Sequence, residues 1–127
     1  MVNFQSAYNK LSDLNSNVSC HYIISRSGSI YNLLPTNIKA WHAGISKWQG
    51  FKNLNDYSVG IELENKGHEH GYQKFTNSQY RSLRKLTDSL IFYHRIKRSD
   101  ILGHSDISPE RKKDPGNKFS WKIIKNP

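Results

Sequence analysis

The sequence predicts a single α/β domain in which helices flank a mixed central β-sheet. Three features lead to this prediction: two strand-like runs separated by a turn at 19–24 and 30–34, a core strand at 57–64, and a long amphipathic helix at 76–94. A length of 127 residues, with 35% hydrophobic and 23% charged residues, suits one domain with one core. We therefore expect residues 1–127 to form one domain.

The first expected element is a helix over residues 4–14. Its apolar residues fall at helical spacing and should form one buried face; they are Phe4, Ala7, Tyr8, Leu11 and Leu14. The runs at 19–24 and 30–34 are rich in aromatic and branched residues, and the turn sequence RSGS at 26–29 between them predicts a hairpin. Pro35 closes the second strand, and residues 41–55 are expected to be irregular before the strand at 57–64.

The longest helix should begin after a capping box formed by Thr76 and Gln79. Its apolar residues continue at helical spacing as far as His94. Residues 100–104 predict a short last strand, and Pro109 and Pro115 then enforce a loop. Strands mixed with at least two helices are typical of a sheet covered by helices.

Charge and cysteine content narrow the function classes. The net charge of +9 implies attraction to polyanions such as nucleic acid, a membrane surface or an anionic wall polymer. The 19 Lys and Arg are spread along the chain without a nucleic-acid-binding motif, so we expect a solvated basic surface and no nucleic-acid partner. Cys20 is the only cysteine, so a metal would need His, Asp or Glu ligands.

No run approaches the roughly 20 apolar residues of a membrane span, and the start lacks a signal-peptide pattern. As written, the chain is expected to be a cytoplasmic monomer.

Residues 103–116, GHSDISPERKKDPG, place His104 at a predicted strand end and Asp114 in the following loop. Both are ordinary zinc ligands, and a catalytic zinc needs three protein ligands with a position left for water. On spacing alone, a polar surface loop is the simpler interpretation, because His and Asp are common in loops.

Other polar residues stand where a functional role is plausible from the sequence. Glu62 lies in the predicted core strand, where an unpartnered carboxylate is unfavourable, so it is a candidate for function. Glu64 shares its strand face and remains the alternative. Trp41 and His42 lie in a loop, where they can contact a sugar or peptide or can anchor the loop to the core.

Four segments taken together resemble the zinc-dependent N-acetylmuramoyl-L-alanine amidases, which are related to phage lysozyme amidase and to peptidoglycan recognition proteins. They are residues 18–22 (VSCHY), 40–44 (AWHAG), 55–65 (NDYSVGIELEN) and 103–116, in the order and rough spacing of the family. The resemblance runs from about residue 4 to residue 121. It implies the fold of that family.

The resemblance also implies roles for individual residues. His104 and Asp114 correspond to two of three ligands of a Zn²⁺ cofactor. Glu62 corresponds to the acid/base residue, and Lys112 to the lysine that stabilises the oxyanion, whereas Lys113 is expected to be a surface charge.

For the rim of the site, the resemblance favours substrate contact by Trp41 and His42, and more weakly by Asn65. His21 is expected to be a satisfied core residue on a strand. The remaining histidines, at positions 68, 70 and 94, are expected on the surface or on a helix.

The activity implied is hydrolysis of the amide bond between N-acetylmuramic acid and L-alanine, in peptidoglycan fragments or muropeptides. The alternative is an inactive peptidoglycan-binding remnant of such an amidase. A nucleic-acid binder, which would show steeply salt-dependent affinity for DNA, is retained only as a check.

In the family, the first zinc ligand is a histidine at the end of an opening strand. Only three residues precede Phe4, so we expect this first strand and its histidine to be absent and the domain to be incomplete at its N-terminus. Three explanations are possible, in order of preference. The start of the protein was placed too late in the gene, the chain is a degenerate remnant of an amidase, or His21 or His42 takes the place of the missing zinc ligand. A lost beginning could have carried an export signal to the periplasm.

Overall fold

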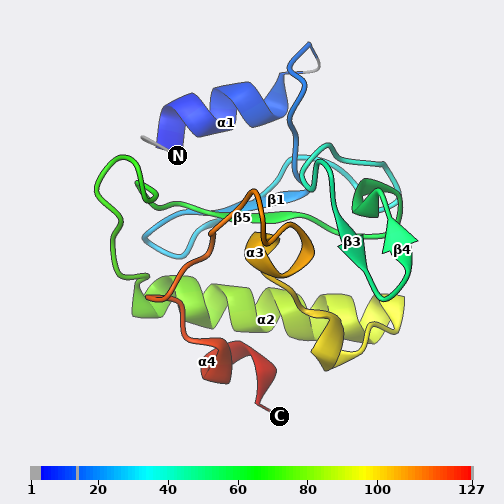
Figure 1. Ribbon diagram of the computed structural model, residues 1–127. Helices are drawn as coiled ribbons and strands as arrows, with labels where there is room; N and C mark the ends of the chain where they lie inside the picture. Colours follow the sequence, from blue (N-terminus) through cyan, green and yellow to red (C-terminus); the bar gives the residue numbers. More distant parts are fainter. Residues whose placement is uncertain (1–3, 14, 127) are drawn as a thin grey trace.

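A computed structural model describes residues 4–13 and 15–126 (Figure 1). Its elements in chain order are α1 (Phe4–Ser12), β1 (Tyr22–Ile24), β2 (Ile30–Asn32), β3 (Lys47–Trp48), β4 (Phe51–Lys52), η1 (Leu54–Asp56), β5 (Ile61–Leu63), α2 (Asn77–His94), η2 (Arg98–Asp100), α3 (His104–Ile107) and α4 (Trp121–Lys125). The fold is an α/β arrangement with a mixed central sheet and helices on both sides, as the sequence predicts.

The central sheet has the strand order β2-β1-β5. β1 is antiparallel to β2, with Ile23 opposite Tyr31, and parallel to β5, with Ile23 opposite Glu62. The pairing of β1 with β2 confirms the predicted hairpin. Each strand has three residues, so the strands are shorter than the predicted ranges.

Helix α2 confirms the clearest local prediction. The Thr76 hydroxyl accepts a hydrogen bond from the Gln79 backbone N–H at 3.0 Å, and the Gln79 side-chain oxygen accepts one from the Thr76 N–H at 3.0 Å. These two bonds form the predicted capping box, which satisfies donors that the first helical turn leaves unpaired. The helix ends at His94, and Arg95 after it has the left-handed conformation common at helix ends.

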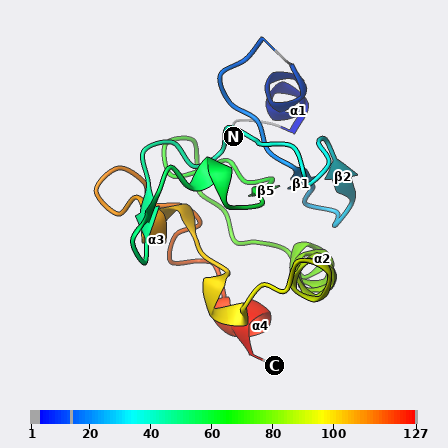
Figure 2. The same ribbon diagram turned by 90° about the vertical axis from the view of Figure 1, so that its right-hand side faces the viewer.

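The core lies between the sheet and the pair α2 and α4, which lie together on one side of it (Figure 2). It contains Ile24 of β1, Tyr80 and Leu83 of α2, Phe119, and Ile124 of α4. Ile61 and Leu63 of β5 also pack against this cluster. Because side chains alternate along a strand, Glu62 between them faces away from the core.

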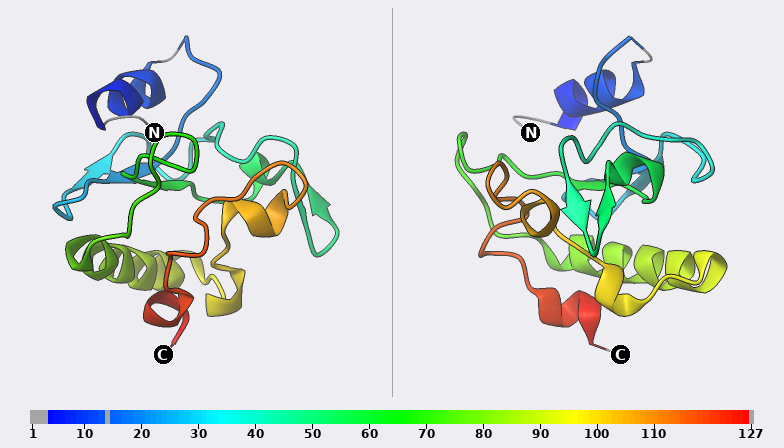
Figure 3. Two further views of the ribbon diagram at one scale, coloured as in Figure 1. Left: turned by 60° about the vertical axis from the view of Figure 1, so that its left-hand side comes forward. Right: turned by 45° about the vertical axis from the view of Figure 1, so that its right-hand side comes forward.

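Helix α1 lies on the other side of the sheet (Figure 3). The expected face is present but only partly buried: Phe4, Ala7, Tyr8 and Leu11 are half-buried, the other α1 residues are exposed, and none of the described α1 residues is fully buried. Its contacts with the sheet include the Phe4 ring, 5.0 Å from the Tyr31 ring on β2. All residues of β2 are themselves exposed, so a helix resting on this strand does not become part of the core. The predicted helix end at Leu14 lies outside the described residues.

The predicted last strand at 100–104 was also wrong. Residues 98–100 form a short 3-10 turn, and His104 begins helix α3. The Asp106 carboxylate accepts the Gly103 N–H at 2.7 Å, which favours a helical turn at this position over an extended strand. A Cβ at Gly103 would lie 2.6 Å from Pro115 Cδ, so only glycine fits where the two ends of the His104–Asp114 loop meet.

Two further elements were not expected from the sequence. Residues 41–55 contain the small β3–β4 hairpin, and the chain ends in α4 against α2. In the described part of the chain, no helix is both long enough and apolar enough to cross a membrane.

Candidate functional site

The centre of the candidate site is the pair His104 and Asp114, from the two ends of one loop. The backbone N–H of Ser105 donates to the Asp114 carbonyl at 2.9 Å, which brings the loop ends together. His104 Nδ1 lies 3.4 Å from Asp114 Oδ2, and His104 Nε2 lies 2.8 Å from the Ala43 carbonyl oxygen. The carbonyl can only accept, so Nε2 carries the proton, and in neutral His104 the Nδ1 lone pair faces Asp114.

This geometry fits a zinc ion. Two donors that lie about 2.0 to 2.1 Å from a tetrahedral zinc ion are about 3.3 Å from each other. The 3.4 Å between Nδ1 and Oδ2 agrees with that separation. A histidine that binds metal usually donates its other N–H to a backbone carbonyl or carboxylate, as His104 does to Ala43. Without a proton or a cation between them, the two acceptors would repel each other.

Within residues 4–13 and 15–126, His104 and Asp114 remain a pair: no three His, Cys, Asp or Glu side chains there are grouped to hold a metal ion. His21 is not available to complete the site. It is fully buried, its Nδ1 accepts the Gly60 N–H at 3.0 Å, and its Nε2 is 2.6 Å from the Ile38 carbonyl oxygen. This confirms His21 as a satisfied core residue.

Glu62 faces the same centre. Burial raises the pKa of Glu62, and the negative charge of Asp114 raises it further, while His104 and Lys112 act in the opposite direction. These influences place the Glu62 carboxyl near all three groups. Burial also acts to raise the pKa of Asp114, but protonated His104, through its hydrogen bond and its charge, acts in the opposite direction, and the pKa of Asp114 lies below its usual value.

The two glutamates near β5 have different surroundings. Glu64 Oε1 accepts the Arg26 backbone N–H at 2.9 Å, so this side chain ties β5 to the β1–β2 turn. The electrostatic influences of His104, Asp114 and Lys112 fall on Glu62. The arrangement therefore favours Glu62 over Glu64 as the acid/base residue.

The adjacent lysines also differ. Lys112 is half-buried and its charge acts on both Glu62 and Asp114. Lys113 is exposed, in line with the expectation of a surface charge.

Trp41 and His42 share a loop but differ in exposure. Trp41 is 52% exposed, and its ring lies 4.4 Å from the Lys39 ammonium. The His42 ring packs against Gly60, where a Cβ would lie 2.5 Å from His42 Cγ. Its Nε2 lies 3.1 Å from the Ser58 hydroxyl. His42 therefore anchors this loop.

The His42 side chain is held in its neutral form. Burial lowers the pKa of His42 to about 4, and the charges of His21 and His104 lower it in the same direction. The influence of His104 shows that the ring lies beside the candidate site.

Asn65 was expected to contact substrate, but it has a structural role in the loop that follows β5. It is buried, its Oδ1 accepts the N–H groups of Gly67 and Gln73, and its Nδ2 donates to the Gln73 carbonyl at 2.8 Å. His68 and His70 are exposed, and His94 is at the end of α2, as expected.

Arg111 is a further member of the site that the sequence did not reveal. Its Nη2 donates to the Ala43 carbonyl at 2.8 Å, which is the same oxygen that His104 Nε2 contacts, and to the Ile45 carbonyl at 3.1 Å. At Gly44, with φ of 64°, a Cβ would lie 2.6 Å from Arg111 Nη2. The sequence contained one indirect indication of this contact: the segment at 40–44 (AWHAG) and the loop at 103–116, which contains Arg111, both resemble segments of the family.

The comparisons with known proteins agree with this geometry. The N-acetylmuramoyl-L-alanine amidase family matches residues 2–117. The chain is 46% identical over 105 residues to 1,6-anhydro-N-acetylmuramyl-L-alanine amidase AmpD of Haemophilus influenzae, covering 82% of this chain and 55% of AmpD. It is 38% identical over 133 residues to N-acetylmuramoyl-L-alanine amidase AmiD of Escherichia coli, covering 95% of this chain and 48% of AmiD.

The structure is similar to that of E. coli AmiD in complex with its substrate, anhydro-N-acetylmuramic acid-L-Ala-D-γ-Glu-L-Lys. The TM-score is 0.87 at 36% sequence identity, over 96% of this chain and 51% of the AmiD chain. The chain thus spans about half the length of the relatives that it matches.

Proposed function

The chain belongs to the N-acetylmuramoyl-L-alanine amidase family, and we propose that it hydrolyses the amide bond between N-acetylmuramic acid and L-alanine in muropeptides, with Zn²⁺ as cofactor. The observation that carries this proposal is the convergence of His104 and Asp114 at zinc-ligand separation beside a half-buried glutamate and a half-buried lysine. The substrate bound to AmiD, an anhydro-muramyl peptide, is the type of molecule that we propose for this chain.

His104 Nδ1 and Asp114 Oδ2 would hold the metal ion. When bound, zinc supplies a Lewis acid that polarises the amide carbonyl and makes a neighbouring water more acidic. The Ala43 carbonyl fixes the tautomer of His104, so that Nδ1 is free to act as a donor to the metal.

Glu62 supplies the proton transfers. Its carboxylate accepts a proton from the attacking water and returns it to the nitrogen of the leaving L-alanine. A pKa raised by burial brings Glu62 closer to neutral pH, where one group can both accept and donate a proton.

Lys112 stabilises the negative charge that develops on the carbonyl oxygen during attack. Its half-buried position strengthens this interaction, because a fixed charge acts more strongly away from bulk water. Trp41 offers an exposed aromatic face to the sugar or peptide at the rim of the site.

A protein that binds peptidoglycan without cutting it is the second candidate. One observation favours it. Within residues 4–13 and 15–126, only two side chains at the centre of the site, His104 and Asp114, are placed to bind a metal ion, whereas a catalytic zinc ion has three protein ligands. The retained Glu62 and Lys112 favour hydrolysis, because a binder has less use for a proton shuttle.

The test is incubation of the purified chain with Zn²⁺ and anhydro-N-acetylmuramyl tripeptide, followed by mass spectrometry. We expect the free sugar and the free tripeptide to appear, and chelation of zinc to stop their release. Binding of the muropeptide without release of peptide would favour the second candidate and overturn the first.

A further inference from the structure

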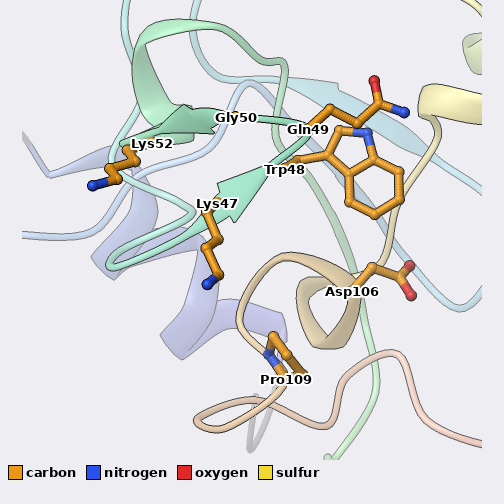
Figure 4. Close-up of a pocket in the computed structure, with 7 residues that line it drawn as sticks. All are labelled: Lys47, Trp48, Gln49, Gly50, Lys52, Asp106 and Pro109. Atoms are coloured by element: carbon orange, nitrogen blue, oxygen red, sulfur yellow. The ribbon is translucent and has the colours of Figure 1, made fainter.

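A pocket of about 390 Å³ lies between the β3–β4 hairpin and the segment that begins with α3 (Figure 4). The hairpin lines one side, and Asp106 and Pro109 line the other. The volume falls within the range of sites for small ligands. This pocket is separate from the candidate site at His104 and Asp114.

The two sites lie on opposite sides of α3. His104 and Asp106 are two residues apart on this helix, so their side chains point about 200° apart around its axis. The pocket lining does not include His104 or Asp114, but Asp106, which lines it, accepts the N–H of Gly103 next to His104 at 2.7 Å. The pocket therefore adjoins the proposed metal-binding pair, and an extended substrate can reach from one to the other.

The hairpin holds its side of the pocket in a defined shape. Gln49 and Gly50, between the two strands, have φ of 48° and 87°, which is typical of the tight turns of two-residue hairpins. The Trp48 indole Nε1 donates to Asp100 Oδ1 at 3.3 Å, so the indole is tied to the turn before α3. The wall is thus formed before a ligand arrives.

The lining combines a positive charge, an apolar surface and a hydrogen-bond acceptor. Lys47 is exposed, points toward the Pro109 loop in Figure 4, and forms no ion pair with the described residues. Trp48 and Pro109 offer apolar faces, and Asp106 is exposed on the facing side. A matching ligand carries a carboxylate for Lys47, small apolar groups for Trp48, and N–H donors for Asp106.

We propose that this pocket binds the carboxylate-bearing peptide of the glycan–peptide unit next to the one being cut. A short peptide with alanine methyls, free carboxylates and amide N–H groups has all three required features. The inference rests on the proposed function and extends it from single muropeptides to the polymer: the chain would cut both, and polymeric peptidoglycan with the higher kcat/KM, because only the polymer presents a second unit.

The test compares cleavage of soluble polymeric peptidoglycan with cleavage of a monomeric muropeptide. In Lys47→Glu, which loses a charge-assisted contact, and in Trp48→Ala, which loses an aromatic one, the ratio of kcat/KM on polymer to kcat/KM on monomer should fall about tenfold. Lys47→Arg keeps the charge and should keep the ratio. Lys85→Glu, on α2, makes the same charge change elsewhere and should leave the ratio at the wild-type value.

Equal ratios in wild type, Lys47→Glu and Trp48→Ala would overturn the proposal. If the wild-type chain cuts neither substrate, the proposed hydrolysis fails, and sedimentation with insoluble peptidoglycan then decides about the pocket. In that assay, the affinity of Lys47→Glu for insoluble peptidoglycan, measured from the fraction of protein in the pellet, should be about tenfold lower than that of Lys85→Glu. Equal affinities of the two variants would contradict the proposal.

Discussion

His104 and Arg111 contact the same backbone oxygen, that of Ala43, each at 2.8 Å. One carbonyl therefore links the loop at 40–44 to both His104, the proposed metal ligand, and the loop that carries Asp114. Through this link, the tautomer and the orientation of His104 depend on residues distant in sequence.

Removing Arg111 should loosen this link. In Arg111→Ala, the carbonyls of Ala43 and Ile45 lose their guanidinium partner, and we expect the free energy of unfolding to fall by about 1 kcal/mol together with weaker zinc binding. Arg111→Lys, which keeps the charge and one donor, should recover part of both. Thermal unfolding and zinc titration measure the two effects. Unchanged zinc affinity in Arg111→Ala would show that Arg111 does not position His104.

Metal binding should depend on Asp114. We expect Asp114→Ala to lose zinc, because one of the two donors at tetrahedral separation is gone. Glu110→Ala removes a carboxylate of the same loop that forms no ion pair with the described residues; it is the matched control and should bind zinc as the wild type does. Metal content after gel filtration provides the measurement. Equal zinc content in both variants would rule out Asp114 as a ligand.

His42 should make stability sensitive to mild acid. The pKa of His42 is lowered to about 4 in the folded chain from an ordinary value of about 6.5, so between these values the unfolded chain binds more protons. This contribution is fully present above pH of about 6.5 and is lost as the pH falls toward 4.

His42→Gln keeps a hydrogen-bond donor for Ser58 but cannot titrate. Urea denaturation at several pH values should therefore give the variant a flatter dependence of unfolding free energy on pH between about 4 and 6.5. Parallel curves for the two proteins would contradict this assignment.

The sequence predicted the elements that local rules determine. Thr76 and Gln79 define the start of α2 because a capping box is formed by nearby residues, and the 19–24 and 30–34 runs pair as a hairpin across a short turn. Resemblance to the family supplied Glu62, Lys112, His104 and Asp114. In the structure, His104 and Asp114 form a close pair, and the charges of this pair and of Lys112 act on Glu62.

The remaining features depend on contacts across the fold. The start of α3 at His104 follows from Asp106 capping Gly103, in a run that looked like a strand from its apolar residues. Helix α1 has the spacing of a helix with a buried face but lies on an exposed strand. The role of Arg111 rests on backbone carbonyls of distant residues, which leave no pattern in the sequence.

The most direct test of the account is turnover of anhydro-N-acetylmuramyl tripeptide by Glu62→Gln, measured beside its zinc content. Glutamine keeps the shape of the side chain but cannot carry the proton, so we predict a loss of about 10²- to 10⁴-fold in kcat with zinc bound as in the wild type. Turnover near the wild-type rate with zinc bound would contradict the assignment of Glu62 as the proton shuttle of this site.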